Sequence, residues 1–433
     1  MNKKYYTQPI IGFILLVLLA IFGKSLSGPK LHLHLFAGLI LGYTLTRARY
    51  GFAGGIKRIY MRGEGSLSKA LIVLLAVTAV AFFAVQMHSV MDGAVPSYLA
   101  EEGEKIIPGT QNVYHISIAT VIGGIIFGIG MMLAGGCGSG TLADFGEGQG
   151  RAMIAFIFFV IGSGPGFYAL KKFENTKLWE LGGRVYLPDY FGHWGALALT
   201  LLLLLFLYYL VIRYENIRKK EGTYMDPKGD YEEFEKPLPN KEVRKFFSYE
   251  TYHKLFVERW SFTVGSLVLA IGAIFVMVTM HKPWGVSTPL MTLNVAVFRN
   301  FIDFPEEIFG SFIEKVDNGL LNDGGTIRNI GLFFGCAISF LLANRFTIDF
   351  DFSFKDGLFF ALGGFLLGFG ARFGQGCNVG AMYSSITSFS LSGWVFLLAM
   401  SLGGIIGLKL FEGKVCVIGT LRKDQLRELK KNR

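Results

Sequence analysis

Residues Gly363 to Gly380 read GGFLLGFGARFGQGCNVG, an apolar segment that is interrupted by glycines and carries one arginine and one cysteine. The same pattern stands 240 residues earlier, where Gly123 to Gly140 read GGIIFGIGMMLAGGCGSG. Seven of the eighteen positions are identical, among them Cys137 and Cys377. We therefore expect two copies of one unit, which place Cys137 and Cys377 at a shared site.

The composition is that of a polytopic membrane protein. Of the 433 residues, 52% are hydrophobic and only 17% are charged, against about 25% charged residues in soluble proteins. The net charge of +10 does not indicate a nucleic-acid partner, because the basic residues concentrate in loops between apolar runs. The four cysteines form neither a CxxC pair nor a zinc framework, so no metal or cofactor is expected.

Ten apolar runs predict an all-α protein with about ten transmembrane helices. They cover residues 9–23, 31–46, 70–87, 115–133, 152–170, 195–212, 262–280, 327–343, 357–373 and 393–410. The first run is short and follows a basic start, as in a signal peptide. It lacks an evident cleavage site, which favours a retained helix.

The distribution of charge predicts the topology. The loop at residues 47–69 holds six Lys/Arg and one acid, whereas the loops at 88–114 and 281–326 are acidic. Basic loops stay in the cytoplasm, so we expect both termini inside the cell. The loop at 171–192, with four Lys/Arg, falls on the outer side against this rule.

In this topology the two cysteine motifs enter the membrane from opposite faces, which defines an inverted repeat. We expect five parts in the chain: an N-terminal helix, a first membrane half, an exposed polar cytoplasmic linker, a second membrane half and a basic cytoplasmic tail. Their bounds are 1–30, 31–212, 213–259, 260–412 and 413–433.

Each cysteine is followed by a segment too short to cross a bilayer, Ser139 to Gly148 and Val379 to Phe389. Such segments suit half-helices or re-entrant loops, whose N-terminal N–H groups attract anions. We expect the substrate path to combine thiols, backbone donors and an arginine, which suits a small sulfur-containing anion. The candidate residues are Cys137, Cys377, Gly136, Gly138, Ser139, Gly376, Asn378 and Arg372.

The same residues have structural interpretations. A cysteine among glycines can be a small buried hydrophobe, and repeated glycines often serve helix packing. Arg372 can extend along the helix to the membrane surface. Recurrence of the cysteine in both halves favours the functional interpretation for the thiols.

At these motifs the sequence resembles the YeeE/YedE family of bacterial inner-membrane sulfur transporters. The resemblance rests on FGIGMMLAGGCGSGTLADFGEG (Phe127 to Gly148), GFGARFGQGCNVG (Gly368 to Gly380), LGYTLTRARYGFAGGIKRIY (Leu41 to Tyr60) and FVERW (Phe256 to Trp260). It implies an hourglass-shaped inverted repeat with short helices reaching toward the centre. It also implies thiosulfate uptake along a path lined by cysteines.

Residue by residue, the resemblance assigns this path to Cys137 and Cys377. Family thiosulfate transporters carry a third cysteine in a stretch that here reads RARYGF, and Gly51 stands in its place. A selenium-containing or other sulfur species therefore remains an alternative substrate. The resemblance also implies a cytoplasmic sulfur-carrier protein as a partner.

The sequence as a whole predicts a transporter and not an enzyme, located in the cell inner membrane with cytoplasmic termini. Two functions of other classes stay open at this point. A membrane thiol-redox enzyme would form a reversible disulfide between Cys137 and Cys377. A scaffold protein would tolerate alanine at both positions.

Overall fold

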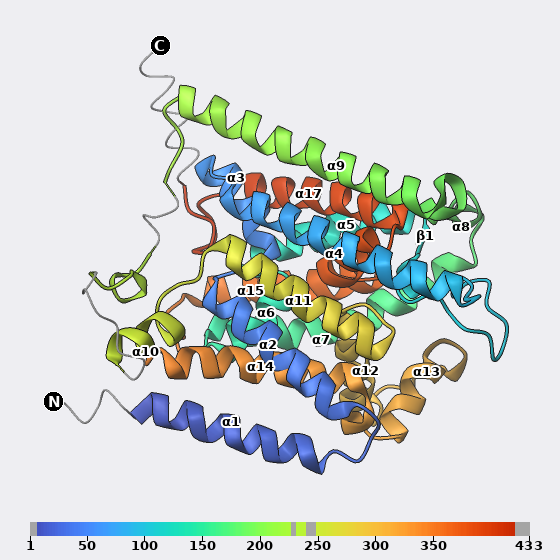
Figure 1. Ribbon diagram of the computed structural model, residues 1–433, viewed down its shortest axis with the longest axis horizontal. Helices are drawn as coiled ribbons and strands as arrows, with labels where there is room; N and C mark the ends of the chain where they lie inside the picture. Colours follow the sequence, from blue (N-terminus) through green and yellow to red (C-terminus); the bar gives the residue numbers. More distant parts are fainter. Residues whose placement is uncertain (1–6, 227–230, 240–247, 421–433) are drawn as a thin grey trace.

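The computed structural model describes residues 7–226, 231–239 and 248–420. Long helices run roughly side by side, with α9 along one edge of the molecule and α1 along the opposite edge (Figure 1). The long helices are α1 (Thr7–Ser25), α2 (Leu31–Arg47), α4 (Ser66–Met91), α5 (Ile118–Leu133), α7 (Gly150–Glu174), α9 (Leu187–Lys220), α11 (Phe262–Met280), α14 (Gly324–Leu342), α15 (Phe354–Phe373) and α17 (Leu391–Phe411).

Short elements connect the long helices. The helical ones are α3 (Phe52–Arg62), α6 (Gly138–Gly146), α8 (Lys177–Glu180), α10 (Tyr249–Phe256), α12 (Ser287–Phe298), α13 (Glu306–Asp317), the π-helical turn η6 (Asn378–Ser384), α16 (Ser385–Thr387) and the 3₁₀ turns η2 (Thr110–Asn112), η4 (Glu233–Glu235) and η5 (Leu320–Asn322). Two short strands, β1 (His115–Ile116) and β2 (Gly183–Arg184), pair antiparallel.

The all-α polytopic fold predicted from the sequence is confirmed. Within the described residues, nine helical segments are long and apolar enough to cross a membrane. The tenth predicted span is α2, which has 17 residues and packs along α14. All ten apolar runs therefore form helices.

The two ends of the bundle differ in the short elements that they carry. The linker end carries α10 and the last residues of α9, and the opposite end carries α8 and α13 (Figure 1). Helix α3 lies toward the linker end and α12 toward the opposite end. These two short helices were not predicted.

The helices pack as an inverted repeat. Matching the two cysteine motifs pairs α2 with α11, α3 with α12, α4 with α14, α5 with α15 and α7 with α17. The contacts follow this pairing: α2 packs on α14 as α11 packs on α4, and α7 packs on α15 as α17 packs on α5. Helices α5 and α15 meet each other at the centre, as do α2 and α11.

The glycines of the repeated motif make the central contact possible. A Cβ added to Gly130 would lie 2.7 Å from the backbone nitrogen of Leu367, and one added to Gly370 would lie 2.5 Å from that of Phe127. Gly123, earlier in α5, instead faces Gly374, just past the end of α15. Contacts in this order show that α5 and α15 run antiparallel, as the predicted topology requires. Small residues allow such close approach of membrane helices.

The polar stretch between the halves is not wholly exposed, contrary to the prediction. Helix α9 continues into it as far as Lys220, and α10 forms at Tyr249–Phe256. Glu235 and His253 are buried against the linker end. Part of this stretch (227–230 and 240–247) and of the basic tail (421–433) lies outside the described residues.

Candidate functional site

The two cysteine turns have the same backbone conformation. Cys137 has φ −87° and ψ −177°, and Cys377 has φ −90° and ψ −177°. The residue two positions before each cysteine is left-handed, with φ 75° at Gly135 and φ 67° at Gln375. The duplicated sequence is thus a duplicated structure, even where glycine is replaced by glutamine.

Gly136 and Gly376 precede the cysteines and keep each turn tight. A Cβ added to Gly136 would lie 3.3 Å from the backbone nitrogen of Thr141, and one added to Gly376 would lie 2.8 Å from that of Ala381. Both nitrogens belong to the first turn of the short helix that follows. The glycines therefore let the chain fold back over a helix N-terminus.

The two turns meet inside the bundle. Cys377 packs on Gly138, since a Cβ added to Gly138 would lie 3.6 Å from the Cys377 Sγ. The ring of Phe159 borders the same point, 3.4 Å from that added atom. Both thiols are free and fully buried. The structure thus brings the two cysteine motifs together, away from the lipid-facing surface.

The Cys137 thiol acts as the N-cap of α6. Its sulfur accepts a hydrogen bond from the backbone N–H of Gly140 at 3.3 Å and lies 3.5 Å from the Oγ of Ser139. Ser139 is itself buried. A thiol that accepts from the backbone keeps its own S–H available to donate. In this geometry the S–H of Cys137 can donate a weak hydrogen bond to a ligand beside the turn.

Arg372 and Asn378 flank Cys377 and are both buried. Arg372 donates to the Oγ of Ser287, on α12, at 2.7 Å. Among the described residues, the Arg372 Nε and both polar atoms of the Asn378 amide have no hydrogen-bond partner. Buried polar groups are normally paired, so these atoms are available to a polar ligand.

Tyr114 adds a hydroxyl near Cys377 and Arg372. It accepts a hydrogen bond from Asn112 at 3.1 Å, and Asn112 also donates to the carbonyl of Gly380 at 2.9 Å. Burial raises the pKa of Tyr114 to about 12, although Arg372 acts in the opposite sense. The hydroxyl is therefore a neutral donor at physiological pH.

A cavity of about 350 Å³ reaches Cys137 from the linker end. Its wall includes residues of α3, the α2–α3 connection, the end of α5, α6 and the start of α7. Gly51 lines it, and a Cβ added there would meet nothing within 4 Å. Cys377 is not part of this wall and lies behind it, against Gly138.

Cations outnumber acids around the cavity. Its charged lining residues are Arg49, Lys57, Arg58, Arg62, Arg151, Asp144 and Glu147. Among the described residues, Arg151 pairs with Asp144 at 2.6 Å, Arg58 pairs with Glu64 at 3.1 Å and Arg49 pairs with Glu147 at 3.4 Å. The excess positive charge suits an anion.

Glu147 has an environment that favours its neutral form. Burial raises its pKa to about 7, and the neighbouring Asp144 adds to this shift, while Arg49 acts against it. The carboxylate accepts a hydrogen bond from Gln149 at 3.1 Å. Near neutral pH the negative charge at this wall of the cavity is therefore incomplete.

The linker contributes one buried acid beside the cavity. Glu235 pairs with Arg49 at 3.2 Å and with Arg345 at 2.5 Å. Arg345 also pairs with Glu232 at 2.7 Å and lies over the ring of Phe234. Arg49 is thus shared between an acid inside the cavity and an acid from the linker.

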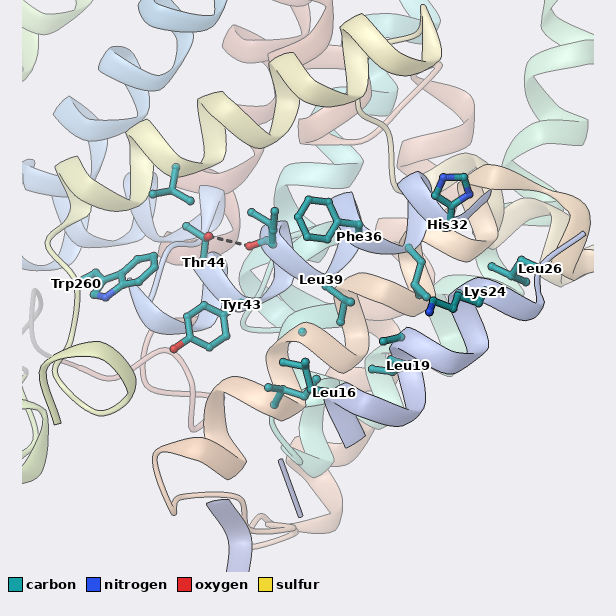
Figure 2. A pocket seen from close by; sticks show the side chains of 17 residues that line it. Leu16, Leu19, Lys24, Leu26, His32, Phe36, Leu39, Tyr43, Thr44 and Trp260 are labelled. Carbon is teal, nitrogen blue, oxygen red and sulfur yellow. Dashed lines mark hydrogen bonds between the residues drawn. The ribbon is translucent and has the colours of Figure 1, made fainter. Parts of the chain in front are cut away.

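A larger groove of about 840 Å³ lies between α1 and α2. Figure 2 shows Leu16 and Leu19 of α1 facing α2, with Trp260 at one end of the groove and His32 at the other. Its lining is almost wholly apolar. Such a surface suits hydrocarbon and not an anion, so the candidate site is the smaller, charged cavity.

The structure brings together most of the residues predicted from the sequence. Cys137, Gly136, Gly138 and Ser139 lie in one turn, and Gly376, Cys377 and Asn378 lie in the turn that meets it. Arg372 lies in the last turn of α15. The lining residues Lys57 and Arg151 were missed, because each stands in a segment that reads as a basic loop or as a helix start.

Comparison with known proteins gives concordant matches. Residues 47–406 match the family described as "Sulphur transport". The thiosulfate transporter TsuA of Escherichia coli (strain K12) is 26% identical over 398 residues, covering 88% of this chain and 93% of that protein. TsuA of Spirochaeta thermophila is 24% identical over 378 residues, covering 85% and 95%. The probable transporter YedE of Salmonella typhimurium is 31% identical over 195 residues, covering 44% and 43%.

Proposed function

The chain belongs to the sulphur-transport family, and on this premise we propose that it imports thiosulfate across the cell inner membrane. It is a multi-pass membrane protein, and the relatives that it matches in this family are transporters. TsuA of Escherichia coli is named a thiosulfate transporter. The observation that carries the substrate proposal is the contact between the two thiol turns, with a cationic cavity ending at Cys137.

The anion is handed from Cys377 to Cys137. Thiols are neutral and donate weak hydrogen bonds, so each site holds the anion loosely enough for release to the next. Arg372 and Asn378 supply further donors beside Cys377. Gly136, Gly138, Ser139 and Gly376 shape the two turns around the passage.

The linker end faces the cytoplasm in this proposal, and so do both termini. Residues 47–69, with six Lys/Arg and one acid, lie on that side, as the positive-inside rule requires. Residues 31–212 and 260–412 form the two repeats, joined by the linker at 213–259. A cytoplasmic sulfur-carrier protein would receive the sulfur at this end.

Uptake of radiolabelled thiosulfate into cells lacking other thiosulfate importers tests the proposal. Cells expressing the protein should accumulate label above cells carrying an empty vector, and unlabelled selenosulfate should compete. Equal accumulation in the two strains would exclude thiosulfate import. Strong competition by selenosulfate with weak thiosulfate uptake would assign the protein to a selenium substrate.

Gly51 offers a second test, because its position faces open space in the cavity. Gly51→Cys should fold normally and place a third thiol on the cavity wall, since no atom lies within 4 Å of the added Cβ. We expect thiosulfate uptake at least equal to that of the unchanged protein. Gly51→Val is the matched control, which fills the same space without a donor and should lower uptake. Equal rates in the two variants would contradict a thiol-lined path here.

A further inference from the structure

Lys57 differs from the other cations of the cavity in its partners. Within the described ranges it forms no ion pair with a carboxylate, and its Nζ donates to the backbone carbonyl of Val417 at 2.5 Å. Val417 belongs to the segment after α17, which is fastened to α15 by a hydrogen bond from the Cys416 N–H to Asp356 at 2.9 Å. An ammonium group has three donors, so two remain for a ligand.

The surroundings of Lys57 are positive. Arg58 and Arg62 lie on the same helix, and Arg151 faces it from α7 across the cavity. Arg58 and Arg151 are paired with acids, whereas Lys57 has no carboxylate partner in the part of the chain that the structure describes. A half-buried cation among cations is stabilised by a bound anion.

The segment that covers Lys57 also reaches the cysteine turn. A Cβ added to Gly135 would lie 3.2 Å from the side chain of Val417 and 2.7 Å from Arg151. Gly135 is two residues before Cys137, so Lys57, Val417 and Arg151 surround the point where the cavity passes the first thiol. An anion leaving Cys137 therefore meets this group of donors next.

We propose that Lys57 is the counterion of an anion-holding subsite on the linker side of Cys137, where a small oxyanion replaces or joins the Val417 carbonyl as its partner. This inference rests on the proposed import function, to which it adds the next binding step. The oxygens of the anion take the free donors of Lys57, and Arg151 lies close enough to share the charge. The subsite then delivers the anion to the linker end.

The titration of Lys57 gives the subsite a signature. Burial and the cations Arg151, Arg62 and Arg58 lower the pKa of Lys57 to about 8, while Asp144 acts against this shift. As pH rises through 8, Lys57 loses its charge and the anion should bind more weakly. Glu147 becomes negative over a lower range, around pH 7, which acts in the same direction. Burial acts to lower the pKa of Arg49, but the carboxylates of Glu147 and Glu235 outweigh it and raise that pKa, so Arg49 keeps its charge over this range.

Calorimetry on the purified full-length protein tests the subsite. Thiosulfate and sulfate are titrated at pH 9 in two buffers of different ionisation enthalpy, which reveals protons taken up on binding. The unchanged protein should take up close to one proton per anion, because binding restores the charge of Lys57. Lys57→Gln should bind about tenfold more weakly and take up no proton, as expected for loss of one charge-assisted hydrogen bond.

Lys57→Arg is the conservative variant, and it should retain affinity without proton uptake because arginine stays protonated. Lys219→Gln, an exposed lysine at the end of α9, is the matched control and should behave like the unchanged protein. Proton uptake or unchanged affinity in Lys57→Gln would overturn the subsite.

Transport into proteoliposomes, measured on the same preparations, separates this inference from the proposed function. Thiosulfate transport with unchanged rate and affinity in Lys57→Gln would remove the subsite and leave the function standing. Lys57-dependent anion binding without thiosulfate transport would support the subsite and exclude the proposed import function. Absence of both binding and transport in the unchanged protein would overturn both.

Discussion

Replacing either Cys137 or Cys377 with alanine should lower thiosulfate uptake by at least about tenfold. Each thiol is buried where the two turns meet, and removing its S–H leaves the anion short of one hydrogen-bond partner inside the bundle. A hydrogen bond to a charged group contributes about 1.5–3 kcal/mol, a weak thiol donor falls at the lower end of that range, and about 1.4 kcal/mol corresponds to a factor of ten. The measurement is the initial rate of labelled uptake at equal protein levels.

The remaining cysteines provide controls for these two variants. Cys416 is exposed, and Cys336 is buried with its Sγ donating to the Gly42 carbonyl at 3.2 Å. Neither lines the cavity, so Cys416→Ala and Cys336→Ala should retain uptake. Undiminished transport in both Cys137→Ala and Cys377→Ala would remove the thiol path. It would also agree with a scaffold function.

The same variants separate transport from thiol-redox chemistry. A redox enzyme would cycle between two thiols and a disulfide linking Cys137 and Cys377, and it would act without net movement of solute. In the structure both thiols are free although their turns touch. Mass spectrometry after rapid alkylation should find both thiols free during thiosulfate uptake.

Gly128→Ala should destabilise the folded protein by about 3 kcal/mol or more, the upper part of the range for overpacked sites. A Cβ at this position would meet the carbonyl oxygen of Met400 and lie 2.6 Å from the backbone nitrogen of Gly404. Both atoms belong to the backbone of α17, so no side chain can move aside. Helices α5 and α17 would have to separate.

Gly380→Ala is the matched control, because Gly380 belongs to the same repeated motif but a Cβ there meets nothing within 4 Å. The midpoint temperature of thermal unfolding in detergent and the yield of monodisperse protein should both fall for Gly128→Ala. Both should stay unchanged for Gly380→Ala. Equal stability of the two variants would contradict the packing assigned to the motif glycines.

Much of the fold could be predicted from the sequence because membrane spans depend on local composition. Every predicted span forms a helix, and the opposite directions of α5 and α15 followed from loop charge. The cysteine turns could be predicted because the motif is duplicated around a rare residue. The seven positions that are identical in the two motifs meet two structural requirements. Their glycines allow close packing of the helices and a tight turn before each cysteine.

Helices α3 and α12 were missed for a physical reason. Helix α3 has eleven residues and carries Lys57, Arg58 and Arg62, so its composition is that of a basic loop. Helix α12 has twelve residues, too few for a span. In the fold, α3 packs on α4 and α17, and α12 packs on α7. The apolar residues of α3 recur at helical spacing, a signal that the basic residues of the same segment concealed. The cavity lining on α3 was missed with the helix.

The linker shows a second limit of sequence reasoning. Its mixed charges predict solvent exposure, yet Glu235 is buried because Arg49 and Arg345, distant in sequence, both reach it. Ion pairs between remote segments leave no periodic signal. Arg372 is a similar case, since its burial against Ser287 depends on α12, a helix that was not predicted.

The most direct test of the shared thiol passage is the position of a bound substrate analogue. Crystals of the protein soaked with selenosulfate would give an anomalous signal at the selenium absorption edge. We expect one peak between the sulfur atoms of Cys137 and Cys377, within hydrogen-bonding distance of at least one of them. A selenium peak remote from both thiols, or thiols that face lipid on opposite sides of the bundle, would contradict it.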